Sequence, residues 1–129
     1  MPSERPHLSL FEKGLVLLVR VHTAQYNYRG EDRLDITVKS GDKTFAPTWD
    51  MVMAYKSGKI TQEEYTEMYY ALMRRSYQNN RRRWEEVLAM DKVVLVCFCR
   101  AGDFCHRLLL AGILEKLGAE YCGEINLSN

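Results

Sequence analysis

Residues 93–118 constrain the fold more than any other part of the chain. Residues 93–99 read VVLVCFC, a continuous apolar run of the length typical of a strand buried on both faces. A short loop over residues 100–105 leads into an amphipathic segment, for which we predict a helix over 106–117, with Gly118 as its C-cap. A strand, a short loop and a helix in this order are typical of a βαβ unit with a right-handed crossover, which indicates a parallel sheet.

The rest of the chain supplies further elements of both kinds. Residues 14–22 include a second buried-strand pattern, and residues 34–40 alternate between apolar and polar side chains, which predicts a strand with Asp35, Thr37 and Lys39 on one face. Helices are expected from Pro47 to Gly58, over 61–77 behind a capping box at Thr61–Glu64, and over 81–90, and a last short strand over 119–125.

The apolar spacing predicts which side of each helix faces the core. The expected inward side chains are Trp49, Met53 and, at the edge of this face, Val52 in the first helix, Tyr65, Met68, Tyr69, Leu72 and Met73 in the second, Trp84, Val87 and Leu88 in the third, and Leu109, Leu110, Ile113, Leu114 and Leu117 in the last. A chain of 129 residues is the size of one domain. We therefore predict the α/β class, as a single Rossmann-like three-layer domain with a mostly parallel sheet over residues 1–129, in which residues 1–11 are a lead-in segment.

Composition excludes several classes of protein. With 47% hydrophobic and 27% charged residues, the chain resembles neither a disordered nor a collagen-like protein. The run over residues 93–99 is far shorter than the roughly 20 residues of a membrane-spanning helix. No secretory signal is recognisable at residues 15–19, because the apolar stretch is too short and follows Glu12. We expect a cytoplasmic protein without a membrane partner.

Charge argues against a strongly basic nucleic-acid binder, because 18 basic and 17 acidic residues leave a net charge of +1. A local basic cluster does occur around Arg81, Arg82 and Arg83, and it is the alternative we keep for nucleic acid. Glu85 and Glu86 follow it directly, which favours a solvated helical face.

The carboxyl ends of the predicted strands are where an open α/β sheet binds its ligands. Here the loop after residue 97 meets the start of the last helix, whose unpaired amides and dipole favour an anion. Gly102 permits close approach of the backbone, and Arg100 and Arg107 suit phosphate contacts. The ligand-binding residues expected in this segment are Cys99, Arg100, Gly102, Cys105, His106 and Arg107.

Two of these residues are also catalytic candidates. A helix start lowers the pKa of a thiol, which favours a thiolate at Cys105, and His106 is a proton donor or acceptor near neutral pH. The alternative is structural: Cys105 is a small packing residue and Arg107 a surface residue.

The loop over residues 22–33 is the second segment that leaves a strand with ligand-binding side chains. Tyr26 and Tyr28 offer ring faces to a planar base, and Arg29 suits a phosphate. A surface loop that uses its tyrosines for packing is the alternative.

Three of the four cysteines fall between Cys97 and Cys105. We expect reduced thiols, since no export signal is present. The spacing matches neither the Cys-x₅-Arg loop of cysteine phosphatases nor a Cys-x-x-Cys redox pair. Cys97, Cys99, Cys105 and His106 match a zinc set in type and number, but the usual spacing is Cys-x₂₋₄-Cys. We therefore predict no metal and no cofactor, and Cys97 as a small buried hydrophobe.

The combination of a strand ending in cysteine, a short loop, Cys-His-Arg and a leucine-rich helix over 93–118 resembles the domain-of-unknown-function family four-eight-eight (DUF488) of small bacterial, archaeal and phage α/β proteins. Residues 28–49, with YRGEDRLDITVKSG and FAPTW, are similar to a phage-associated branch of it. The resemblance implies a Rossmann-like three-layer fold. It also implies a site made of Cys97 or Cys99, Cys105, His106, Arg107 and the loop over 26–29, and it carries no settled activity.

These observations favour one function and leave two alternatives. We predict that the chain binds a nucleotide-like anionic small molecule at the carboxyl ends of the strands, and in a phage-encoded chain this would suit sequestering a host signalling nucleotide. The first alternative is an enzyme acting on a nucleotide or on a nucleic-acid-derived substrate through Cys105, His106 and Arg107. The second is nucleic-acid binding through residues 81–83. Assembly into a homo-oligomer is left open.

Overall fold

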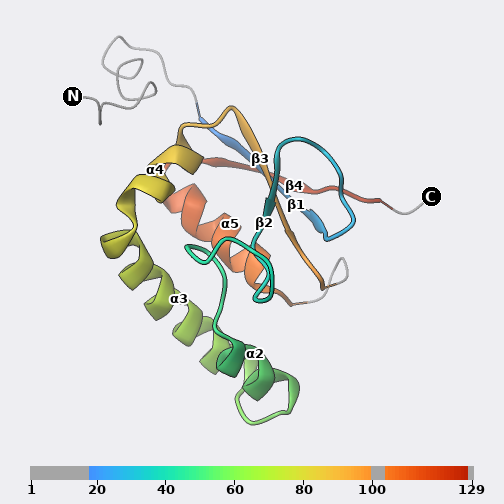
Figure 1. Ribbon diagram of the computed structural model, residues 1–129, viewed down its shortest axis with the longest axis vertical. Helices are drawn as coiled ribbons and strands as arrows, with labels where there is room; N and C mark the ends of the chain where they lie inside the picture. The colour runs from blue at the N-terminus through green and yellow to red at the C-terminus, as the bar shows by residue number, and fades with distance from the viewer. Residues whose placement is uncertain (1–17, 100–103, 128–129) are drawn as a thin grey trace.

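The computed structural model describes residues 18–99 and 104–127. Its centre is a four-stranded sheet in the order β2-β3-β1-β4, in which every paired strand is parallel to its neighbour (Figure 1). The strands are β1 (Arg20–Gln25), β2 (Arg33–Asp35), β3 (Lys92–Cys97) and β4 (Glu120–Glu124). The predicted α/β class and parallel sheet are confirmed.

Four helices accompany the sheet: α2 (Trp49–Lys56), α3 (Gln62–Asn79), α4 (Arg81–Leu88) and α5 (His106–Lys116). Each lies within two residues of its predicted bounds. The capping box of α3 forms as expected, because Glu64 N–H donates to the Thr61 hydroxyl and Thr61 N–H donates to the Glu64 carboxylate. None of the described helices is long and apolar enough to cross a membrane.

One large core joins the helices to one face of the sheet. Helix α5 packs on β1, β3 and β4, and α3 lies alongside α5 (Figure 1). All four helices contribute buried side chains, among them Met51, Tyr69, Trp84, Leu110 and Leu114, and the strands contribute Val21, Val93, Leu95 and Cys97. The other face of the sheet carries a smaller cluster of Ala24, Val94 and Val96, which the loop residues Tyr26, Tyr28 and Ile125 cover. Burial on both faces explains the uninterrupted apolar run in β3.

The predicted strand over residues 34–40 is wrong beyond its first two residues. β2 ends at Asp35, whose carboxylate accepts hydrogen bonds from Thr37 N–H at 2.8 Å and from the Ser40 hydroxyl at 2.6 Å. This local turn takes the chain off the sheet, so Asp35, Thr37 and Lys39 do not share a strand face. The first strand also differs from its prediction, since β1 extends to Gln25; residues 14–17 lie outside the described part of the chain.

The predicted inward face holds completely for α4 and in part for α3 and α5, whereas Trp49 and Met53 of α2 are exposed. Tyr65, Tyr69, Met73, Trp84, Val87 and Leu88 are buried as expected. Trp49 and Met53 are not, with exposed fractions of 50% and 45%, and Met51 is the buried residue of α2. Helix α2 has only eight residues and packs against α3 at the edge of the core, so it has no wide face to cover. Met68 and Leu117 are also exposed.

Candidate functional site

A small cavity opens where β3 ends and α5 begins. Its volume is about 140 Å³, and its aromatic wall consists of Tyr55, Tyr65, Phe98 and Phe104. Three of the predicted ligand-binding residues, Cys99, Cys105 and His106, lie in its lining. The cavity therefore sits at the carboxyl end of a central parallel strand, where ligands bind in open α/β sheets.

Three rings form the inner wall of this cavity. The ring centroids of Tyr55, Tyr65 and Phe104 lie 5.5–5.6 Å from one another, and Phe104 meets both tyrosines edge-on. Pockets for complete drug-sized ligands measure about 300–1,000 Å³. A cavity of about 140 Å³ is smaller, so its volume is sufficient for only part of such a ligand.

The sulfur atoms of three cysteines gather beside this wall. Those of Cys97, Cys99 and Cys105 all lie within 4.8 Å of one another, and the Cys97 and Cys105 sulfurs are in contact. The Cα atoms of this pair are 7.9 Å apart. A disulfide cannot bridge Cα atoms more than about 7 Å apart without movement of the backbone. We call Cys97, Cys99 and Cys105 the sulfur cluster; the prediction of reduced thiols is not borne out by the contact between Cys97 and Cys105. Cys122, which is exposed in β4, lies outside it.

His106 is buried against this cluster and held in one orientation. Its Nε2 lies 2.6 Å from the carbonyl oxygen of Ile36, and because a carbonyl only accepts, Nε2 carries the hydrogen. Burial lowers the pKa of His106 to about 4, despite the opposing effect of this hydrogen bond. The ring is therefore neutral at pH 7, and its Nδ1 is an acceptor 3.8 Å from the Cys105 sulfur. A ring with this pKa is a weak base, so the contact is a hydrogen bond from the Cys105 thiol and not a thiolate–imidazolium pair.

Arg107 lies behind the sulfur cluster and has no exposed surface. Its guanidinium donates to the sulfur of Cys97 at 2.9 Å and to the carbonyl of Cys99 at 3.0 Å, and forms an ion pair with Glu124 at 3.0 Å. The alternative prediction of a surface residue is therefore wrong for Arg107, and Arg107 does not line the cavity either. Glu124 has no signal of its own in the sequence, because only the parallel pairing of β4 with β1 brings it under Arg107.

The loop after β1 forms a second hollow next to the cavity. Tyr26, Tyr28 and Arg29 line it as predicted, together with Asn27 and Arg33. Tyr26 stacks on Phe98 with ring centroids 4.2 Å apart, and the guanidinium of Arg33 lies 4.4 Å above the Tyr26 ring. Phe98 lines the cavity and touches Tyr26, so the two rings connect the cavity to the hollow. The two other predicted residues, Arg100 and Gly102, lie outside the described part of the chain.

The site therefore contains aromatic residues that motif reasoning missed. Tyr55 and Tyr65 belong to α2 and α3, and Phe98 and Phe104 border the loop after β3. Phe98 has an exposed fraction of 59%, which is high for a large apolar side chain. The one signal in the sequence is that Phe98 lies between two cysteines at the end of the apolar run over residues 93–99.

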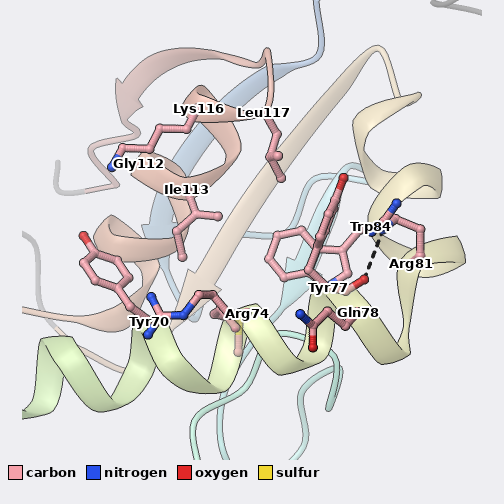
Figure 2. Close-up of a pocket in the computed structure, with 11 residues that line it drawn as sticks. Tyr70, Arg74, Tyr77, Gln78, Arg81, Trp84, Gly112, Ile113, Lys116 and Leu117 are labelled. Carbon is pink, nitrogen blue, oxygen red and sulfur yellow. Dashed lines mark hydrogen bonds between the residues drawn. The ribbon is translucent and has the colours of Figure 1, made fainter.

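A larger cavity of about 470 Å³ lies between α3, α4 and α5 (Figure 2). Tyr70, Arg74 and Tyr77 reach it from α3, Arg81 and Trp84 from α4, and Lys116 from α5. Arg81 stacks over the Tyr77 ring at 3.9 Å and donates to the Tyr77 carbonyl.

The three arginines of the predicted basic cluster have different surroundings. Arg81 lines the larger cavity, whereas Arg83 forms ion pairs with Asp42 at 2.7 Å and with Glu86 at 3.1 Å. Arg82 is exposed. Nucleic-acid binding through these residues stays a prediction.

Comparison with known proteins identifies a family. The profile of the Active DUF488-N3 subclade matches residues 13–118, which include the cavity, the sulfur cluster and the Cys-His-Arg sequence. No curated protein and no solved structure matches the chain. The likeness to a phage-associated branch is not part of this match and stays a prediction. Because the matched residues make up most of its length, the chain belongs to the DUF488 family, within the Active DUF488-N3 subclade.

Proposed function

We propose that the chain binds a nucleotide-like anionic small molecule, with the planar ring of the ligand in the cavity at the end of β3. The observation that carries this proposal is the continuous aromatic path from the cavity to the loop hollow. Tyr55, Tyr65 and Phe104 surround the cavity, and Phe98 and Tyr26 lead from it to the hollow. Aromatic pairs contribute roughly 0.5–1.5 kcal/mol beyond the area that they bury.

Cations stand where the outer part of such a ligand would lie. Arg29 is exposed in the loop hollow, and Arg33 lies over the outer ring of the path. Lys56 is exposed at the rim of the cavity. A ligand with its ring inside the cavity and a phosphate beside these cations would contact both predicted binding segments, the one at the start of α5 and the loop after β1. We propose a cytoplasmic protein, and in a phage-encoded chain this site would sequester a host signalling nucleotide.

Calorimetry and thermal unfolding with mono-, di- and cyclic nucleotides and ADP-ribose derivatives test the proposal. A ligand at about 100 times its Kd stabilises the fold by roughly 2.7 kcal/mol, which is a readily measured shift. Phe98→Ala should weaken the binding by about tenfold, because it interrupts the aromatic path. Met68→Ala is the matched control, since Met68 is comparably exposed on α3 and lines neither site. The absence of a shift with every compound contradicts the proposal.

A second candidate function is thiol-dependent catalysis, which the contact between Cys105 and His106 favours. With Nε2 held by Ile36, Nδ1 can accept the Cys105 proton while the sulfur attacks a compound bound in the cavity. Iodoacetamide should then modify Cys105 faster than a simple thiol at pH 6, and His106→Gln should slow the reaction. Cys122, which is exposed, is the internal reference. A Cys105 that reacts no faster than Cys122 rules out this candidate, and turnover of a bound compound distinguishes catalysis from binding.

A further inference from the structure

The three sulfurs of the cluster lie close enough together to bind one metal ion. Cys97 is the last residue of β3, Cys99 follows it closely, and Cys105 is the N-cap of α5, so one loop brings the three sulfurs together. All three lie within 4.8 Å of one another. Two thiolates on one tetrahedral zinc ion, each at about 2.3 Å from it, are roughly 3.8 Å apart. The Cys97 and Cys105 side chains would rotate apart to reach the spacing of two metal ligands.

A buried positive charge lies beside the cluster. The buried guanidinium of Arg107 donates to the sulfur of Cys97 at 2.9 Å. A guanidinium has only donors, and a neutral thiol is a weak acceptor, so this contact favours an anionic sulfur. A direct bond between Cys97 and Cys105 is disfavoured by their Cα separation of 7.9 Å. This separation of the two backbones suits two thiolates that bind the same metal ion.

We propose that Cys97, Cys99 and Cys105 bind one thiophilic divalent ion, of which Zn²⁺ is the type. Soft thiolates select this class of metal. Three protein ligands leave a fourth position, as in catalytic zinc sites. All three cysteines line the cavity, so the fourth position is reached from it. The inference replaces the expectation of no metal, which rested on the short spacing between Cys97 and Cys99.

The residues around the cluster suit this role. Arg107 donates to Cys97 and is itself balanced by Glu124, so three thiolates and a divalent ion, with a net charge of −1, have a cation beside them. His106 stands at the edge of the cluster, and its Nε2–H is oriented by the carbonyl of Ile36. Outer hydrogen bonds of this kind orient the groups around a metal ion. The inference does not depend on a nucleotide ligand, but it excludes Cys105 as a free nucleophile.

Titration of the full chain with Co²⁺, purified reduced and free of metal, tests the proposal. We expect one Co²⁺ per chain, a sulfur-to-cobalt charge-transfer band, and displacement of Co²⁺ by Zn²⁺. With Zn²⁺ bound, three of the four thiols should be protected from a thiol reagent. Cys99→Ser should weaken binding by more than about 100-fold, which exceeds the effect of losing an outer-shell partner. Cys122→Ser, in an exposed strand position, is the matched control and should bind as the unaltered chain does.

Cys99 is the first choice for substitution because Cys97 and Cys105 are almost fully buried. Circular dichroism checks that the variant is folded, and Cys105→Ser is the second variant if Cys99→Ser is not. A reduced, folded chain without the charge-transfer band overturns the proposal. So does an equal loss of Co²⁺ binding in Cys99→Ser and Cys122→Ser. Because no nucleotide is present, this result is independent of whether the proposed ligand binds.

Discussion

The guanidinium of Arg107 donates a hydrogen bond to the sulfur of Cys97 while it forms an ion pair with Glu124. Cys97 ends β3 and Glu124 ends β4, and these two strands flank β1 in the sheet. The first turn of α5 therefore ties together two strands that do not pair with each other. This connection holds the sulfur cluster against the sheet and makes Arg107 a structural part of the site.

Glu124→Ala tests how strongly this connection stabilises the fold. It leaves the buried Arg107 without its carboxylate, and loss of one partner from a buried pair costs about 3–5 kcal/mol. Asp91→Ala is the control, because it breaks the exposed pair between Asp91 and Arg20, which contributes about 0–1 kcal/mol. Urea unfolding measures both. Equal losses in the two variants would show that Arg107 finds another partner.

The buried His106 should make the stability depend on pH. Its pKa is about 4 in the folded chain, against an ordinary value of 6.5. Between these values the unfolded chain binds more protons, so the stabilisation is complete above pH 6.5 and is lost as the pH falls towards 4. A shift of this size corresponds to roughly 3 kcal/mol.

Urea unfolding of the wild type at pH 7 and at pH 4.5 measures this loss, and His106→Gln removes the titrating group. The difference between the two pH values should be smaller in His106→Gln. An unchanged dependence in His106→Gln would contradict the assignment.

Much of this fold is predictable from local patterns. The capping box at Thr61, the helix break at Asn80 and the apolar run of β3 each specify their structure through neighbouring residues, and each is confirmed. The short strand β2 is not predictable in this way. Its alternating pattern continues past Asp35, but the Asp35 carboxylate bonds to the turn that follows and ends the strand. A side chain that competes for backbone groups overrides the period of two.

The site is predictable only in part for a related reason. Cys105 and His106 follow a strand and open a helix, so the fold rule alone locates them at the carboxyl end of the sheet. The aromatic wall comes from α2 and α3, which are remote in sequence and meet the loop only through tertiary packing. The position of Arg107 in the first turn of a helix is typical of an anion-binding residue. Its burial depends on Glu124, which belongs to the strand after that helix. Long-range partners of this kind leave no mark on local spacing.

Ser76→Ala should destabilise the helical side of the core. The Ser76 hydroxyl donates to the carbonyl of Thr44 at 2.6 Å and accepts from the indole N–H of the fully buried Trp84 at 3.1 Å. Alanine leaves both groups without this partner, at an expected cost of about 1–3 kcal/mol. Ser57→Ala, which removes an exposed hydroxyl after α2, is the control and should change stability by less than about 0.5 kcal/mol. Urea unfolding compares them, and equal effects would mean that water replaces Ser76.

Two glycine-to-alanine substitutions should have opposite effects. Gly41 closes the turn after β2, where an added Cβ would collide with the backbone of Thr37 and come within 2.7 Å of the Asp35 carbonyl. Overpacking of this kind costs about 1–3 kcal/mol, so Gly41→Ala should destabilise the chain. Gly112 lies inside α5, where an added Cβ meets nothing within 4 Å. Gly112→Ala should therefore stabilise the chain by about 0.5–1 kcal/mol, because alanine favours the helix.

The same pair of substitutions probes the site. The turn that Gly41 closes follows Ile36, whose carbonyl orients His106, and includes Thr37, which lines the cavity. Displacement of this turn should loosen the histidine, so Gly41→Ala should also slow any reaction of Cys105 that depends on His106. Gly112→Ala, which lies away from that turn, should leave the reaction unchanged. Thermal unfolding and iodoacetamide labelling of both variants measure the two effects, and a normal labelling rate in a destabilised Gly41→Ala would uncouple the turn from the site.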